Sequence, residues 1–149
     1  MTHDLAHKTI LLVEDNPDDI DLALRAFRKH NLANQIIVKQ DGQEALDYML
    51  ASTNTGNMEN RCPIQVVLLD LNLPKIDGLE VLRSLRQAKH TRYLPVVILT
   101  SSDEEQDIEE SYRLGCNSYI RKPVEFDSFV SAAQHIGLYW LLLNETVNS

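Results

Sequence analysis

A chain of 149 residues, 44% of them hydrophobic and 24% charged, has the size and composition of one globular domain, which excludes disordered and collagen-like proteins. Its formal net charge of -8 at pH 7 disfavours direct binding of nucleic acid, whose phosphates need clustered Lys and Arg. Without a CxxC pair, a secretory signal or an apolar run of the roughly 20 residues that span a membrane, the chain is expected to be a soluble protein of the reducing cytoplasm.

The first part of the chain alternates between apolar runs and helical patterns. Residues 9–13 form a continuous apolar run, which predicts a strand buried on both faces of a parallel sheet. Asn16, with a proline after it, predicts the start of a helix in which apolar residues recur at helical spacing. A second strand is expected at 36–38, and Asp41 with Glu44 forms a capping box that begins a second helix.

A polar stretch separates these two units from the third. Residues 51–63 have no apolar period and predict an exposed insertion. The run at 66–69 is the most hydrophobic of the chain and predicts a third strand. Asp77 is expected to cap the following helix, which carries leucines at 79, 82 and 85.

Two further units complete the pattern. Residues 95–99 predict a fourth strand. Ser101, Ser102, Glu104 and Glu105 predict the start of a helix, whose acidic residues suit the positive end of the helix dipole. A short fifth strand is predicted at 118–120 and a final helix at about 125–143.

Five strand–helix units predict an α/β fold with helices on both faces of a parallel sheet, joined by right-handed crossovers. Functional sites in such sheets gather beyond the carboxyl ends of the strands. Glu14 and Asp15 follow the first strand, Asp70 the third, Thr100 the fourth and Lys122 the fifth. We therefore expect these side chains to meet at one edge of the sheet.

Their chemistry suits phosphoryl transfer. Crowded carboxylates repel one another unless a cation neutralises them, and a cluster of oxygen ligands without His or Cys predicts Mg²⁺ rather than zinc. Asp70 can act as a nucleophile toward phosphorus and form an acyl phosphate. Lys122 and the hydroxyl of Thr100 can then donate to the phosphoryl oxygens.

These residues resemble the receiver domain of two-component response regulators, over residues 8–143. The resemblance implies a single receiver domain with a three-layer, doubly wound, flavodoxin-like (βα)5 fold and a five-stranded parallel sheet in strand order 2-1-3-4-5. The matching segments are Val13-Glu14-Asp15-Asn16, Leu69-Asp70-Leu71-Asn72-Leu73-Pro74, Asp77-Gly78, Leu99-Thr100-Ser101 and Lys122-Pro123.

By this resemblance Asp70 is the phosphoacceptor, and Mg²⁺ is held by Asp15, Asp70, the backbone carbonyl of Asn72 and, through a water, Glu14. Glutamate at position 14 departs from the commonest pair of two aspartates. The resemblance also implies a histidine kinase as phosphodonor. The chain itself is not expected to be an enzyme beyond accepting phosphate and slowly losing it.

The resemblance further implies a switch. Thr100 and Lys122 would bind the phosphoryl group, Tyr119 would turn into the space that Thr100 vacates, and a surface formed by the fourth helix, fifth strand and fifth helix would signal. The alternative for Tyr119 is static packing at the edge of the sheet. Asn72 and Ser102 flank the site, where family variation tunes hydrolysis.

The last predicted helix is apolar on most sides, which predicts a second buried surface. We expect a homodimer through Leu138, Tyr139, Leu142 and Leu143. An internal stripe, or packing against the chain's own amino terminus, is the alternative. With no output domain expected after this helix, signalling would proceed through an unidentified downstream protein.

The insertion at 51–63 and the tail from Tyr139 to Glu145 resemble the small response regulators that pair with cyanobacterial phytochromes, which implies a phytochrome-type histidine kinase as partner. Three alternatives stay open. A pseudo-receiver would act as a dimeric interaction module without phosphorylation. A hydrolase of the haloacid dehalogenase type normally has an aspartate where this chain has Asn72. A nucleotide-binding protein is the third alternative, but the sequence contains neither of the glycine-rich loops GxGxxG and GxxxxGK[ST].

Overall fold

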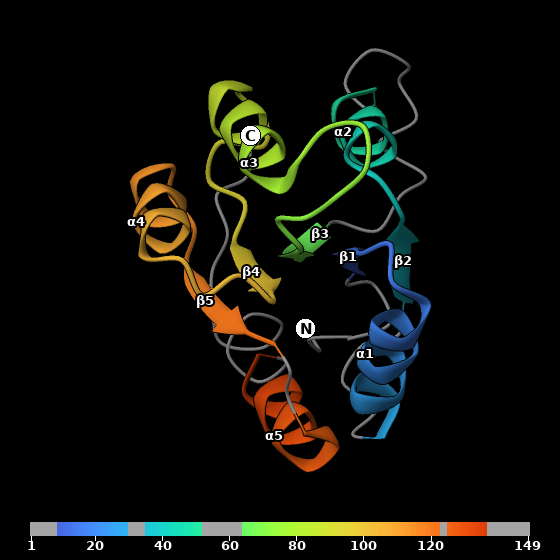
Figure 1. Cartoon of the computed structure of the whole chain (residues 1–149). Coiled ribbons are helices and arrows are strands. Elements are labelled where there is room, and N and C mark those ends of the chain that lie inside the picture. The colour runs from blue at the N-terminus through green and yellow to red at the C-terminus, as the bar shows by residue number, and fades with distance from the viewer. Residues whose placement is uncertain (1–8, 30–34, 52–63, 123–124, 137–149) are drawn as a thin grey trace.

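The computed structural model describes residues 9–29, 35–51, 64–122 and 125–136, in which strands alternate with helices (Figure 1). The strands are β1 (Thr9–Val13), β2 (Gln35–Lys39), β3 (Ile64–Leu69), β4 (Val96–Thr100) and β5 (Ser118–Arg121). The helices are α1 (Pro17–Lys29), α2 (Gly42–Ala51), α3 (Gly78–Gln87), α4 (Glu105–Arg113) and α5 (Phe126–Ile136).

All four strand pairs are parallel, and the sheet has the order β2-β1-β3-β4-β5. Figure 1 shows α1 and α5 on one face of the sheet and α2, α3 and α4 on the other. The prediction of a three-layer, doubly wound, flavodoxin-like fold is therefore confirmed. In this topology the chain direction across the sheet reverses between β1 and β3, which opens a crevice at their carboxyl ends.

Strand β1 is buried along its whole length because each of its faces packs on a layer of helices. Ile10 and Leu12 belong to the apolar cluster on the α1–α5 side, with Phe27 of α1. Leu11 and Val13 belong to the cluster on the α2–α3 side. Two buried faces explain why the strand reads as an unbroken apolar run rather than an alternating one.

Side chains cap α1 and α3 as the sequence predicts. The Asn16 side-chain oxygen accepts from the backbone N–H groups of Asp18 and Asp19, at 2.9 and 3.2 Å. The Asp77 carboxylate accepts from the backbone N–H of Glu80 at 3.0 Å. These caps satisfy donors that have no partner inside the helix, and they fix the first turn of each helix beside the strand that precedes it.

The starts of α2 and α4 differ in part from the prediction. Asp41 accepts from the backbone N–H of Glu44 at 2.7 Å, but the Glu44 carboxylate accepts at 3.5 Å from the residue before Asp41, so the capping box is shifted by one residue. The helix expected around Ser102 begins at Glu105. Glu104 is its N-cap residue and makes no side-chain cap bond, while the Ser102 hydroxyl accepts from the backbone N–H of Glu104 at 3.3 Å.

Two predicted boundaries differ from the structure, and two predicted segments lie outside the described residues. Strand β4 runs one residue later than 95–99, because Pro95 has no N–H to donate to a neighbouring strand. Ala51, expected in the insertion, is the last residue of α2. Residues 52–63 of the insertion and 137–143 of the last helix lie outside the described residues. No helix among the described residues is long and apolar enough to cross a membrane.

Candidate functional site

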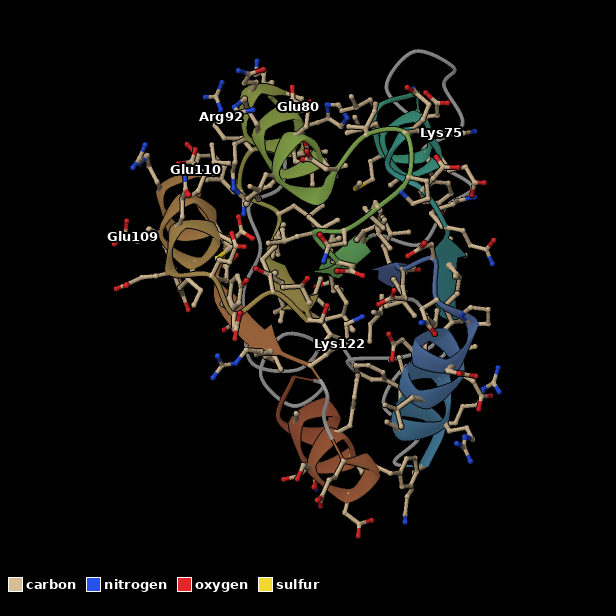
Figure 2. All side chains as sticks on the ribbon, in the orientation of Figure 1. Lys75, Glu80, Arg92, Glu109, Glu110 and Lys122 are labelled. Carbon is tan, nitrogen blue, oxygen red and sulfur yellow. The ribbon has the colours of Figure 1, made fainter. Side chains whose placement is uncertain are left out.

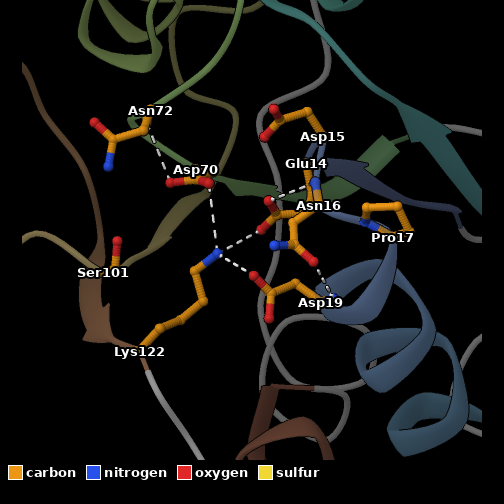
Figure 3. A pocket seen from close by; sticks show the side chains of 9 residues that line it. All are labelled: Glu14, Asp15, Asn16, Pro17, Asp19, Asp70, Asn72, Ser101 and Lys122. Atoms are coloured by element: carbon orange, nitrogen blue, oxygen red, sulfur yellow. Dashed lines mark hydrogen bonds and ion pairs between the residues drawn. The ribbon is translucent and has the colours of Figure 1, made fainter.

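The carboxyl edge of the sheet holds a cleft of about 590 Å³ (Figure 3). Its lining comes from the segments that follow β1, β3, β4 and β5 and from the first turn of α1. Five of the predicted site residues, from positions far apart in the sequence, share this cleft. The lining residues are Glu14, Asp15, Asn16, Pro17, Asp19, Asp70, Asn72, Ser101 and Lys122.

Three carboxylates meet in the cleft. Glu14, Asp15 and Asp70 each offer an oxygen within 4.8 Å of the others. The Asp70 N–H donates to the carbonyl of Val13 at 3.0 Å, which ties the ends of β3 and β1 together. Glu14 and Asp70 are buried, whereas Asp15 is exposed and gives solvent access. A cluster made of carboxylates alone fits a hard divalent cation, as the sequence predicts.

Lys122 lies at the centre of the site. Its ammonium donates to Asp19 at 2.7 Å, to Glu14 at 2.8 Å and to Asp70 at 3.4 Å. The backbone N–H of Lys122 donates to the carbonyl of Thr100 at 2.7 Å, which holds the end of β5 beside β4. Figure 2 shows Lys122 pointing into the molecule, whereas a surface cation such as Lys75 lies at the periphery.

The buried charges perturb each other's protonation. Burial raises the pKa of Glu14 to about 7; the hydrogen bond from Lys122 opposes this rise, and the nearby charge of Asp70 adds to it. Burial alone would lower the pKa of Lys122, but its hydrogen bonds to Asp19 and Glu14 and the charge of Asp70 prevail, so that pKa lies above its usual range. Lys122 is therefore a permanent cation at this site.

Asp19 is the site residue that the sequence did not single out. It is the third residue of α1, and its carboxylate reaches across the cleft to Lys122 (Figure 3). The available signal was indirect: Asn16 predicts a helix that starts at the rim of the site, so an acid in its first turn lies close to the other carboxylates. Which way that acid points depends on how α1 is rotated against β5.

Thr100 and Tyr119, the predicted switch residues other than Lys122, lie beside the cleft. Thr100 is fully buried at the end of β4, and its hydroxyl accepts from the N–H of Ser102 at 3.5 Å. The half-buried Tyr119 donates its hydroxyl to the Ser102 carbonyl at 3.0 Å. The Ser102 hydroxyl donates to the Asp107 carboxylate of α4 at 2.6 Å. Ser102 thus connects β5 to α4, while Ser101 is the residue of this loop that lines the cleft.

The two residues predicted to tune hydrolysis occupy different environments. Asn72 is exposed, lines the cleft and donates its backbone N–H to Asp70 at 3.2 Å. Ser102 faces Asp107 instead. The predicted dimer surface, formed by Leu138, Tyr139, Leu142 and Leu143, lies outside the described residues.

Comparison with known proteins agrees with this geometry. The family model described as the response regulator receiver domain matches residues 10–134. The probable methanogenesis regulatory protein FilR2 of Methanothrix harundinacea is 39% identical over 137 residues, which cover 92% of this chain and 86% of that protein. Response regulator Rcp1 of Synechocystis is 36% identical over 134 residues, which cover 90% of this chain and 89% of Rcp1.

Solved structures are similar over nearly the whole chain. The phosphorylated cyanobacterial phytochrome response regulator RcpA matches with a TM-score of 0.81 and 36% identity, covering 94% of this chain and 98% of RcpA. The Mn²⁺-bound form of Rcp1 matches with a TM-score of 0.78 and 34% identity, covering 94% of this chain and 99% of Rcp1. The bacteriophytochrome response regulator AtBRR matches with a TM-score of 0.68 and 54% identity, covering 92% of this chain and 97% of AtBRR. This chain belongs to the response regulator receiver domain family.

Proposed function

We propose that this chain accepts a phosphoryl group on Asp70 from a histidine kinase, in a reaction that depends on Mg²⁺. The observation that carries the proposal is the position of the Asp70 carboxylate. It lies 3.4 Å from the ammonium of Lys122 and within 4.8 Å of oxygens of Glu14 and Asp15, in an open cleft. The phosphorylated state of the similar protein RcpA supports the same reaction here.

In the proposed reaction an Asp70 oxygen forms a bond to phosphorus while the bond between phosphorus and the donor nitrogen breaks. The electron pair of that bond stays with the nitrogen of the kinase histidine. Lys122 donates to a phosphoryl oxygen and stabilises the charge that gathers there. Because the phosphorylated side chain carries about two negative charges where the Asp70 carboxylate carried one, this acidic site can hold the product only if cations balance the added charge.

Carboxylates of the cleft would hold the metal ion. Asp15 and Asp70 would bind it directly, with the backbone carbonyl of Asn72, and Glu14 through a water. Bound Mg²⁺ would offset charge on the transferring oxygens. The Mn²⁺-bound form of the similar Rcp1 supports a divalent cation at such a site, and the all-oxygen donor set favours magnesium.

Intact-mass measurement after incubation with Mg²⁺ and acetyl phosphate tests this function. We expect the wild type to gain the mass of one phosphoryl group and Asp70→Asn to gain none. Asp47→Asn, which changes an exposed aspartate on α2, is the matched control and should be labelled normally. Label on Asp70→Asn contradicts the assignment, and an unlabelled wild type favours the pseudo-receiver alternative. Steady hydrolysis of small phosphate esters would favour a hydrolase.

We propose that Thr100, Lys122 and Tyr119 convert phosphorylation into a change on the α4–β5–α5 surface. The contact of Tyr119 with Ser102 gives the Thr100 loop a direct connection to that surface. Thr100→Ala is expected to accept phosphate without changing affinity for a partner, whereas Thr100→Ser, which keeps the hydroxyl, should respond like the wild type. A normal response of Thr100→Ala removes Thr100 from the mechanism.

We also propose that Asn72 and Ser102 set the lifetime of phosphorylated Asp70. Asn72 lines the cleft, where water must enter for hydrolysis, so we expect Asn72→Ala to change the rate of phosphate loss more than Ser102→Ala. The rate of phosphate loss of each variant is measured as the decay of the phosphorylated mass after acetyl phosphate is removed. Equal lifetimes for wild type and Asn72→Ala contradict the assignment.

The proposed phosphodonor is a phytochrome-type histidine kinase of the cytoplasm, on the basis of the similarity to RcpA, Rcp1 and AtBRR. Label transfer from several purified kinases to Asp70 tests it, and a faster transfer from an unrelated kinase contradicts it. A downstream protein would receive the signal.

A homodimer through Leu138, Tyr139, Leu142 and Leu143 is proposed from the sequence pattern alone. Light scattering should give a dimer mass that Leu142→Asp reduces and Asn144→Asp leaves unchanged. A wild-type mass that stays monomeric at all concentrations contradicts it.

A further inference from the structure

The ammonium of Lys122 is shared by three carboxylates, and the proposed reaction has no role for one of them. Asp19 is the acceptor at the shortest distance, 2.7 Å, compared with 2.8 Å for Glu14 and 3.4 Å for Asp70. A lysine ammonium has three N–H donors, so these contacts engage all of them. A phosphoryl oxygen on Asp70 can therefore gain a bond from Lys122 only if a present acceptor gives one up.

Burial decides which acceptor is easiest to release. The Glu14 side chain is 2% exposed, and without Lys122 it would lose the charge that compensates its burial. The Asp19 side chain is 30% exposed and can exchange the ammonium for water. Lys122 itself is 12% exposed, so solvent reaches this ion pair mainly from the side of Asp19. Release of Asp19 thus costs less than release of Glu14, and it would let the ammonium shift toward Asp70, whose contact at 3.4 Å is the longest of the three.

The backbone of Asp19 is well positioned for such a role. Its N–H donates to the capping side chain of Asn16 at 3.2 Å, which fixes the first turn of α1 at the rim of the cleft. From there the carboxylate points across the cleft to Lys122 (Figure 3). The contact joins α1 to the end of β5, two elements that are more than 100 residues apart in the chain.

We propose that Asp19 is a positioning residue that holds the ammonium of Lys122 on the α1 side of the cleft and competes with the phosphoryl group for it. The inference rests on the proposed phosphorylation of Asp70. While Asp70 is unmodified, Asp19 keeps Lys122 partly withdrawn. When the phosphoryl group arrives, Lys122 exchanges Asp19 for a phosphoryl oxygen. Asp19 therefore sets a threshold for phosphorylation without touching the phosphoryl group.

The test compares two substitutions of equal charge on the same helix turn. Asp19→Asn removes the competitor and is expected to raise the rate of Asp70 phosphorylation by acetyl phosphate, at saturating Mg²⁺, by about fivefold, the upper range for partly exposed ion pairs. Asp18→Asn removes the same charge from the neighbouring exposed residue, whose carboxylate is not among the three on Lys122, and should change the rate by less than about twofold.

A conservative variant separates charge from shape. Asp19→Glu keeps a carboxylate that can still reach Lys122, so its rate should stay within about twofold of the wild type. A rate for Asp19→Asn that equals that of Asp18→Asn, or falls below the wild type, overturns the proposal, as does an Asp19→Glu rate as high as that of Asp19→Asn. An unlabelled wild type would refute the proposed function itself, whereas label at equal rates refutes this inference alone.

A double-mutant cycle gives a readout that does not depend on phosphorylation. Unfolding in urea is measured for the wild type, Asp19→Asn, Lys122→Met and the double variant. The two substitutions are expected to couple by about fivefold in the unfolding equilibrium constant, because each removes the other's partner. The cycle of Asp18→Asn with Lys122→Met should show no coupling. Equal coupling in the two cycles would mean that Asp19 acts as general negative charge and would overturn its role as a partner of Lys122.

Discussion

Replacing Arg86 by methionine is expected to destabilise the protein strongly, because this guanidinium of α3 bonds to backbone carbonyls rather than to an acid. It donates twice to Gly115, at 2.7 and 3.2 Å, and once to Leu94 at 2.8 Å. Weaker bonds reach Arg92 at 3.1 Å and Thr91 at 3.3 Å. Arg86 thus joins the loop before β4 to the turn after α4.

The magnitude follows from the two shortest contacts. A hydrogen bond from a charged donor contributes about 1.5 kcal/mol at the lower end of its usual range, and Arg86 makes two such bonds under 3 Å. Burial lowers the pKa of Arg86, which shows that desolvation opposes part of this gain. The longer contacts offset that cost, and methionine keeps most of the apolar packing of the stem. We expect a loss of about 3 kcal/mol.

Urea unfolding at equal m-value measures this loss. Arg83→Met is the matched control: Arg83 lies on the same helix, but its partners Glu80 and Glu110 are carboxylates in surface ion pairs. We expect that variant to lose less than about 1 kcal/mol. If Arg86→Met loses as little as Arg83→Met, the carbonyl contacts do not stabilise the fold and the reasoning fails.

Three further results are expected. Gly78→Ala should cost about 3 kcal/mol or more in thermal unfolding, because a Cβ there would lie 2.2 Å from the carbonyl oxygen of Asp70; an unchanged Tm would contradict this. Leu12→Ala should cost about 2–5 kcal/mol in chemical denaturation, since Leu12 is 2% exposed in the core, and a loss below about 1 kcal/mol would show that the core relaxes. Burial raises the pKa of the Cys116 thiol to about 11, so in a Cys62→Ser background its reaction with a disulfide reagent should keep accelerating from pH 9 to 11 in the folded chain, whereas the thiol in urea should level off near pH 9. A plateau near pH 9 in the folded chain would contradict that pKa.

The apolar pattern predicts the sheet well because burial on both faces leaves little ambiguity. Strands β1, β3 and β4 lie on continuous apolar runs and are almost entirely buried, whereas β5 reads Ser-Tyr-Ile-Arg and is only half-buried. The errors arise where polar residues take part: β2 extends to Gln35 and Lys39, which an apolar run cannot indicate. The predicted start of α4 is too early, because the helix begins only at Glu105. Ser102 does bond to this helix start, but it accepts from the N–H of Glu104, two residues on, and donates to Asp107, so it precedes the N-cap position instead of occupying it.

The residues of the site also differ in how far the sequence predicts them. Asp15, Asp70 and Lys122 are predictable because each lies within two residues of the end of a strand, and parallel strands end at one edge. Asp19 is not, because its contact with Lys122 depends on the rotation of α1 against β5, which no local pattern records. The burial of Glu14 and its pKa near 7 likewise depend on the surrounding chain.

The two bonds of Ser102 have a mechanical consequence. Its carbonyl accepts from Tyr119 on β5, while its hydroxyl donates to Asp107 on α4, and both groups belong to a single residue two positions after Thr100. A displacement of its backbone would strain both contacts, so a shift of the Thr100 loop, as in the switch proposed above, would reach β5 and α4 together. One residue thus links the end of β4 to two parts of the proposed signalling surface.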